Sequence, residues 1–248
     1  GPNAVGYTLN IPLPPHTSEE GFLHVIRNAV RPILEDFKPQ LIVNSAGQDN
    51  HYTDPITNMN FSAQGYAELT ALLNADIAVL EGGYSIEGAL PYVNLGIVLA
   101  MAGLDYSKVR EPDYDRRQVR QSEAVTAAVK EVSDLILACW TGRDQLREKM
   151  LEKRDSHRRT RRIYYDTDGI SESQQEEITA CDVCGGAIRI DSVSDRGAHI
   201  LAVHIPRKAC PSCREAGLKW YDQASIKRYD RVFLQDRTQD QYLVKKSD

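Results

Sequence analysis

Four of the five cysteines in this 248-residue chain form two C-x-x-C pairs, Cys181 with Cys184 and Cys210 with Cys213. Twenty-five residues separate the pairs, and two stretches among them alternate like β-strands. Four thiolates at this spacing are typical of a closed, tetrahedral zinc site that stabilises a fold rather than catalysing a reaction. The pattern predicts a zinc ribbon instead of disulfides, and with it a reducing, cytoplasmic setting.

Two other polar residues stand directly after short apolar runs. Asp49 follows the run QLIVNSAG, and Tyr84 follows DIAVLEGG. Such runs predict buried parallel strands, and ligands of parallel sheets bind beyond the carboxyl ends of the strands. If the two strands are neighbours, Asp49 and Tyr84 border one crevice. The alternative is a plain strand-to-helix turn with an incidental tyrosine.

The elements that must position these residues alternate along the first part of the chain. A helix with one buried face is predicted from Thr17, with Ser18 as part of its hydroxyl cap, and Pro32 should kink or split it. A longer helical stretch, predicted over 116–153, should break at Gly142. Strands are predicted over 7–13, 40–46 and 76–80, and shorter helices over 62–73 and 85–102, the last one capped by Ser85. This alternation predicts an α/β fold, a parallel sheet with crossover helices.

Three regions are expected: an α/β region over 1–110, a helical linker or extension over 111–160, and a small β-rich zinc-ribbon domain over 161–248. Strands of the last region are predicted over 163–169, 187–193 and 199–205 and in the tail. His199 and His204 are expected to be surface or packing residues. The basic run KRDSHRRTRR (153–162) could contact phosphates, but it is more typical of a solvated hinge.

Charge and hydropathy exclude some classes of protein. The net charge is −5, with −7 over residues 1–150 and +2 over residues 151–248, so extensive nucleic-acid binding is not expected. No apolar run is long enough for a membrane span, and no signal peptide opens the sequence.

Three segments resemble motifs of the histone deacetylase / acetylpolyamine amidohydrolase family: GYTLNIPLPPHTSEEGFL, LIVNSAGQDNHYTDPITNMNFSAQGY and VLEGGYSIEGALPYV. They occur in the family's order, at sensible spacing, over residues 6 to about 103. The resemblance implies the C-terminal half of the arginase–deacetylase α/β fold. Gln48 and His16 depart from the family pattern, which has an aromatic residue and a glycine there.

The resemblance implies hydrolysis of an acetyl-amide, on acetyl-lysine, an acetylpolyamine or a small acetylated amine. Asp49 matches a zinc-binding carboxylate, and Tyr84 matches the catalytic tyrosine that donates to the tetrahedral oxyanion. Gly82 and Gly83 match the glycines beside the substrate's acyl group. Two zinc ions are therefore expected, one catalytic and one structural.

The family's upstream Asp-x-His pair and tandem histidines have no counterpart in this sequence, and His51 is not expected to bind metal. We expect another chain or a missing segment to supply the N-terminal half of the site. The alternative is an inactive deacetylase-like protein that assembles with a partner through its zinc ribbon. Homo-oligomerisation is possible in either case.

Overall fold

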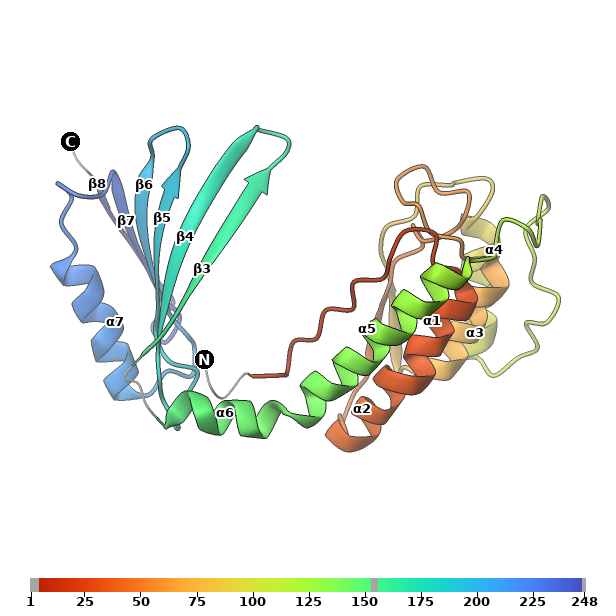
Figure 1. Cartoon of the computed structure of the whole chain (residues 1–248), viewed down its shortest axis with the longest axis horizontal. Helices are drawn as coiled ribbons and strands as arrows, with labels where there is room; N and C mark the ends of the chain where they lie inside the picture. Colours follow the sequence, from red (N-terminus) through yellow and green to blue (C-terminus); the bar gives the residue numbers. More distant parts are fainter. Residues whose placement is uncertain (1–4, 153–155, 247–248) are drawn as a thin grey trace. The chain divides into compact units, whose positions relative to one another are not determined.

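A computed structural model describes residues 5–152 and 156–246 of the chain, which divides into two compact units. The N-terminal unit is Leu9–Thr141, and the C-terminal unit contains Gly142–Asp248 together with Gly1–Thr8. One unit is mixed α/β and the other is built on one large sheet (Figure 1). The predicted pairing of an α/β fold with a β-rich module is confirmed. Among the described helices, none is long and apolar enough to cross a membrane.

The first helical run of the N-terminal unit has three parts: α1 (Glu19–Val25), η2 (Ile26–Val30) and α2 (Arg31–Phe37). The middle part is a π-helix, and it ends just before Pro32. Proline lacks the N–H that the regular helical ladder would use, so the wider turn accommodates it. Ser18 precedes α1, but its hydroxyl donates to a side chain outside the helix, so the predicted hydroxyl cap is wrong.

Two parallel strands form the small sheet of this unit, β1 (Val43–Ala46) and β2 (Ile77–Leu80). Helix α3 (Ala63–Leu73) lies between them in sequence, and the Ser62 hydroxyl caps it by accepting the N–H of Gly65 at 3.1 Å. Helix α4 (Leu90–Met101) follows β2 and packs on α3. The predicted start of α4 at Ser85 is wrong, because the helix begins only where Pro91 can occupy its first turn.

No strand forms over the predicted segment 7–13. Its side chains Leu9, Ile11 and Leu13 pack instead against a core cluster contributed by the first helical run and by α5 (Glu123–Thr141). A second cluster lies under β1, α3 and α4 and contains Ala46, Phe61, Ala63, Tyr66, Ala89, Val93, Ile97 and Val109. Helix α6 (Arg143–Leu151) begins after Gly142, at the predicted break.

The C-terminal unit is a six-stranded sheet in the order β3-β4-β5-β6-β7-β8. Neighbouring strands are antiparallel except β6 and β7, which are parallel and are connected through α7 (Pro211–Gln223). Helix α7 packs on one face of the sheet, over β5, β6 and β7 (Figure 1). The strands are β3 (Ser156–Tyr165), β4 (Ile170–Thr179), β5 (Ile188–Ser194), β6 (His199–Ile205), β7 (Arg231–Asp236) and β8 (Gln241–Lys246).

The sheet corrects one prediction about this region. Residues 156–162 of the basic run are part of β3 and pair with β4, so they are not a solvated hinge. Residues 153–155 lie outside the described residues. Threonine, isoleucine and tyrosine favour a strand here, and glutamates of β4 neutralise its arginines.

Candidate functional site

Asp49 and Tyr84 converge at the carboxyl ends of β1 and β2. The parallel register pairs Ala46 with Leu80, so the chain leaves both strands at the same edge of the sheet. A methyl group on Gly82 would lie 3.3 Å from Asp49 Oδ2 and 3.3 Å from Tyr84 Oη. The two side-chain oxygens therefore approach the same point, and Gly82 leaves the space beside them open.

Glycines also shape the backbone around this point. A side chain at Gly83 would place its Cβ 2.8 Å from Gln48 Cβ, which is closer than packed carbon atoms allow. The Gln48 N–H donates to the carbonyl of Gly82 at 2.5 Å, so the two loops are joined directly. On its other side, the Asp49 carboxylate faces Gly47, where a Cβ would lie 3.2 Å from Oδ1. The paired glycines are thus needed for close approach of two loops.

Asp54 anchors the tyrosine loop, a role that the sequence analysis missed. Its Oδ2 accepts the backbone N–H of Tyr84 at 2.7 Å, and its Oδ1 accepts the N–H of Ile56 at 2.9 Å. The hydroxyls of Thr53 and Ser85 add a contact of 2.6 Å between the same two loops. The Asp-Pro dipeptide at 54–55 signals a turn, but nothing local points to a bond 30 residues away.

A buried contact between His51 and Glu111 supports the loop that carries Asp49. His51 is fully buried, and its Nδ1 accepts the N–H of Thr53 at 3.2 Å, which puts the ring proton on Nε2. That nitrogen faces Glu111 Oε1 at 3.4 Å. Burial acts to raise the pKa of Glu111, but hydrogen bonding to His51 and to the backbone outweighs it and lowers the pKa. The predicted absence of a metal role for His51 stays a prediction.

Tyr66 forms the inner wall behind Asp49. Its hydroxyl accepts the backbone N–H of Asn50 at 3.1 Å, and burial raises its pKa far above the ordinary value. The carboxylates of Asp49 and Asp54 raise it further. The phenol therefore stays neutral and is buried, whereas Tyr84 is about half exposed.

The described residues do not form a complete catalytic zinc site around Asp49. Within the described ranges, the single group of three or more side chains that could hold a metal is the cysteine group of the C-terminal unit. Zinc in a catalytic site takes three protein ligands, and Asp49 is one carboxylate. The described residues alone therefore do not define a metal-dependent reaction at Asp49.

The four predicted cysteines do converge. Cys181 and Cys184 lie between β4 and β5, Cys210 is the N-cap of α7, and Cys213 lies in its first turn. The sulfurs of Cys181, Cys184 and Cys210 are 3.7, 3.7 and 3.8 Å apart, and all four sulfurs lie within 4.8 Å of one another. Sulfurs at a Zn–S distance of about 2.3 Å form a tetrahedron with edges of about 3.8 Å. The geometry therefore fits a tetrahedral metal ion such as zinc.

The polypeptide shifts the pKa values of the two buried cysteines of the group in opposite directions: burial and the neighbouring cysteine side chains raise the pKa of Cys213, whereas the pKa of Cys184 is lowered. Burial acts to raise the pKa of Cys184, but hydrogen bonds from the backbone of Cys210 and Gly186 outweigh it and bring the pKa to about 7. Two histidines of the central strand β6 point elsewhere: His199 contacts Asp191 at 2.7 Å, and His204 contacts a glutamine. The second C-x-x-C pair begins a helix, so the module is ribbon-like at the cysteines and larger than a simple ribbon.

Comparison with known proteins shows what the N-terminal unit is similar to. Residues 2–95 match the model of the "Histone deacetylase domain" family. Over 117 residues, 44% of this chain, the sequence is 56% identical to a "Probable deacetylase" of Archaeoglobus fulgidus, and the match covers 33% of that relative. A "Histone deacetylase-like amidohydrolase" of Pseudomonas aeruginosa is 31% identical over 128 residues, which are 48% of this chain and 33% of the relative.

Among solved structures, the "HDA15 HD domain" superposes with a TM-score of 0.44 at 21% identity, over 60% of this chain and 40% of that chain. The chain spans about a third of the length of the curated relatives it matches. Residues 2–95 of this chain are therefore similar to the histone deacetylase domain family, and a module with a zinc-ribbon-like cysteine cluster follows them.

Proposed function

We propose that this chain forms the C-terminal half of a zinc-dependent deacetylase site that hydrolyses an acetyl-amide. Acetyl-lysine, an acetylpolyamine and a small acetylated amine are the candidate substrates. The observation that carries the proposal is the convergence of Asp49 Oδ2 and Tyr84 Oη on the space above Gly82. A carboxylate and a phenol at one point suit a metal ligand beside a hydrogen-bond donor.

Each residue has a defined part in this proposal. Asp49 is an anionic ligand of the catalytic zinc, an ion that polarises carbonyls and activates water. Tyr84 donates its hydroxyl hydrogen to the oxygen that becomes negative when the amide carbonyl is attacked. A donor of this kind typically contributes about 10²- to 10³-fold in rate. Gly82 and Gly83 lie beside the acyl group in this proposal: a side chain at Gly82 would fill the approach to both oxygens, and one at Gly83 would push the tyrosine loop away from Gln48.

A polypeptide supplying the N-terminal half of the domain completes the site in this proposal. Parallel sheets are normally covered on both faces, yet β1 and β2 expose Val43, Ile77, Val79 and Leu80, each by 46–55%. Such an apolar sheet is typical of a surface that another segment covers. The same segment would bring the remaining zinc ligands and the general base.

The C-terminal unit binds a second, structural zinc in this proposal. The four sulfurs stand at separations that suit a tetrahedral zinc ion. Such a site holds β4, β5 and α7 together and takes no part in hydrolysis. A metal-binding cysteine cluster of this kind would suit the reducing, cytoplasmic setting expected from the sequence.

Complementation tests the proposal. The full chain is co-expressed with the part of the Archaeoglobus fulgidus relative that lies outside its matched third, and the purified complex is assayed with acetyl-lysine peptides and acetylpolyamines. Hydrolysis that Tyr84→Phe lowers by about 10²-fold or more supports the proposal. A stable complex that hydrolyses none of these substrates would favour the alternative, an inactive assembly protein.

A further inference from the structure

Strand β3 is an open edge of the six-stranded sheet. Its ten residues, Ser156–Tyr165, pair with β4 along their whole length, and no other strand of the described chain pairs with its outer side (Figure 1). The outer backbone N–H and C=O groups of such a strand are free to pair with another extended segment. The edge is also densely charged, since four of its ten residues are arginines.

On each face of the sheet, these arginines lie above a glutamate of β4. On one face, Glu177 accepts from Arg158 at 3.2 Å and from Arg189 of β5 at 2.7 Å. On the opposite face, Glu176 is bound by Arg159 and Arg161. The carboxylates are thus shared, and each guanidinium keeps further N–H groups for a ligand.

The side-chain exposures show what a ligand would meet. The two glutamates are only 3% and 15% exposed, whereas Arg158, Arg159 and Arg161 are 52–75% exposed. The negative charges therefore lie beneath a layer of guanidinium groups that the glutamates hold in place. Preorganised guanidinium forks recognise planar oxyanions, because two N–H groups meet two oxygens.

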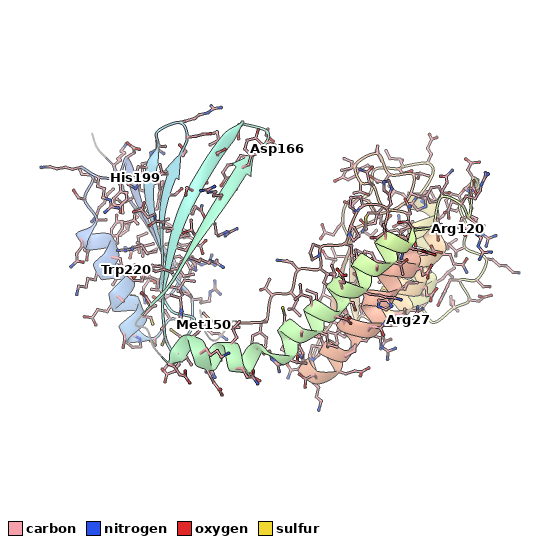
Figure 2. The ribbon with its side chains drawn as sticks, viewed as in Figure 1. Arg27, Arg120, Met150, Asp166, His199 and Trp220 are labelled. Atoms are coloured by element: carbon pink, nitrogen blue, oxygen red, sulfur yellow. The ribbon has the colours of Figure 1, made fainter. Side chains whose placement is uncertain are left out.

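A groove of about 490 Å³ runs beside this edge, and its lining includes Arg158, Arg189 and Arg228. Two aromatic rings border these arginines, and guanidinium groups already face both of them. Arg189 lies 5.5 Å from the ring of Trp220, which Figure 2 labels, and Arg228 lies 5.1 Å from that of Tyr229. Single-stranded nucleic acids bind by stacking bases on free aromatic faces, so the groove does not suit them.

We propose that β3 docks an extended, acidic polypeptide segment. The segment adds a seventh strand to the sheet, and its carboxylates meet Arg158 and Arg162 on one face and Arg159 and Arg161 on the other. Main-chain pairing along the edge supplies binding, and the arginines select acidic side chains. This surface lies in the C-terminal unit, and the proposal does not depend on the deacetylase function.

Fluorescence anisotropy with the full chain tests this. The probe is a labelled peptide of about ten residues, enough to span β3, in which pairs of glutamates alternate with pairs of valines so that both faces of the docked strand carry carboxylates. We expect saturable binding that weakens about tenfold in Arg158→Gln/Arg162→Gln, because both removed charges face the docked strand. Both side chains are exposed, so a thermal melt should show an intact fold. The matched control, Arg207→Gln/Lys219→Gln, removes two exposed charges elsewhere and should bind like wild type.

Two further ligands make the outcome decisive. A peptide of the same charge in which proline replaces valine cannot pair as a strand, and it should bind about tenfold more weakly. An oligothymidylate of equal charge should bind no better than the proline peptide. Equal binding of both peptides, preference for the oligonucleotide, or no binding of the acidic peptide would each overturn the proposal; the last would mean that the arginines merely protect the edge.

Discussion

The backbone N–H of Tyr84 donates to Asp54 Oδ2 at 2.7 Å, and this bond fixes the proposed catalytic tyrosine from a loop 30 residues earlier. The second oxygen of Asp54 accepts the N–H of Ile56. One carboxylate therefore stabilises the turn in which it lies and also binds the loop that carries Tyr84. Asp49 lies in the same loop as Asp54. One turn therefore sets the positions of both residues that converge over Gly82.

Asp54→Ala should loosen this arrangement. The Asp54 side chain is only 7% exposed, so its removal leaves the N–H groups of Tyr84 and Ile56 without an acceptor in a buried position. The free energy of unfolding, measured in urea, should fall by about 1–3 kcal/mol. In the complemented enzyme, the rate should fall with little change in metal content. Asp105→Asn is the control, because Asp105 accepts the N–H of Ser107 in an exposed turn and should change neither quantity.

The two glycines of the tyrosine loop should respond differently to alanine. Gly83→Ala places a Cβ 2.8 Å from Gln48 Cβ and Leu90 Cδ2, and this overpacking should lower the free energy of unfolding by about 1–3 kcal/mol. Gly82→Ala meets Asp49 Oδ2 and Tyr84 Oη at 3.3 Å and should mainly impair turnover. Urea unfolding and initial rates of both variants check this contrast. The same loss of stability in both would show that Gly82 faces packed protein rather than a site.

Removal of one cysteine ligand should empty the structural metal site. Zinc analysis of the isolated chain should give one ion per chain, and Cys184→Ser should abolish that ion and destabilise the C-terminal unit, because metal binding and folding are coupled. Cys139→Ser is the matched control, since Cys139 is exposed on α5, outside the cysteine group. A full complement of zinc in Cys184→Ser would contradict a four-cysteine site.

Asp236 should make stability depend on pH. The side chain is fully buried on β7, and it accepts from Arg214 Nε at 2.8 Å and from the Thr238 N–H at 2.9 Å. Burial acts to raise its pKa, but these hydrogen bonds outweigh it and lower the pKa. A carboxylate whose pKa is lower in the folded state stabilises the fold above its unfolded pKa of about 3.9, and that stabilisation is lost as pH falls through the folded value.

Asp236→Asn should therefore cost about 1–3 kcal/mol near neutral pH and progressively less as the pH falls below about 4. Unfolding in urea at several pH values measures this difference. Asp240→Asn is the control, because Asp240 is exposed in the turn between β7 and β8 and asparagine tolerates its positive φ of 52°. A difference for Asp236→Asn that does not shrink in acid would contradict a charge-based contribution.

The sequence was sufficient to predict the parallel pairing behind Asp49 and Tyr84. Each strand segment contains a short apolar run, LIV at 41–43 and IAVL at 77–80, and the glycines after them mark where the chain must turn sharply. The start of α4 was less predictable, because Ser85 resembles a cap while Pro91 determines where the helix can begin. Apolar and polar residues alternate over segment 7–13 as they would in a strand, yet Leu9, Ile11 and Leu13 pack against helices and pair with no described strand.

Contacts between distant residues account for most of what sequence reasoning missed. The bond from Tyr84 to Asp54 and the buried pair of His51 with Glu111 join segments 30 or more residues apart. Neither segment carries a local pattern that identifies its partner. Residues 156–162 of the basic run were misassigned for the same reason, because the glutamates that neutralise their arginines lie on the next strand.

Zinc stoichiometry of the complemented protein tests the central claim most directly. The claim is that Asp49 and Tyr84 are the two contributions of this chain to one hydrolytic zinc centre. Elemental analysis of the complex should find two zinc ions per chain, and the Asp49→Asn complex should retain only the ion of the cysteine site. Two ions in both complexes, or one ion in both, would contradict the account.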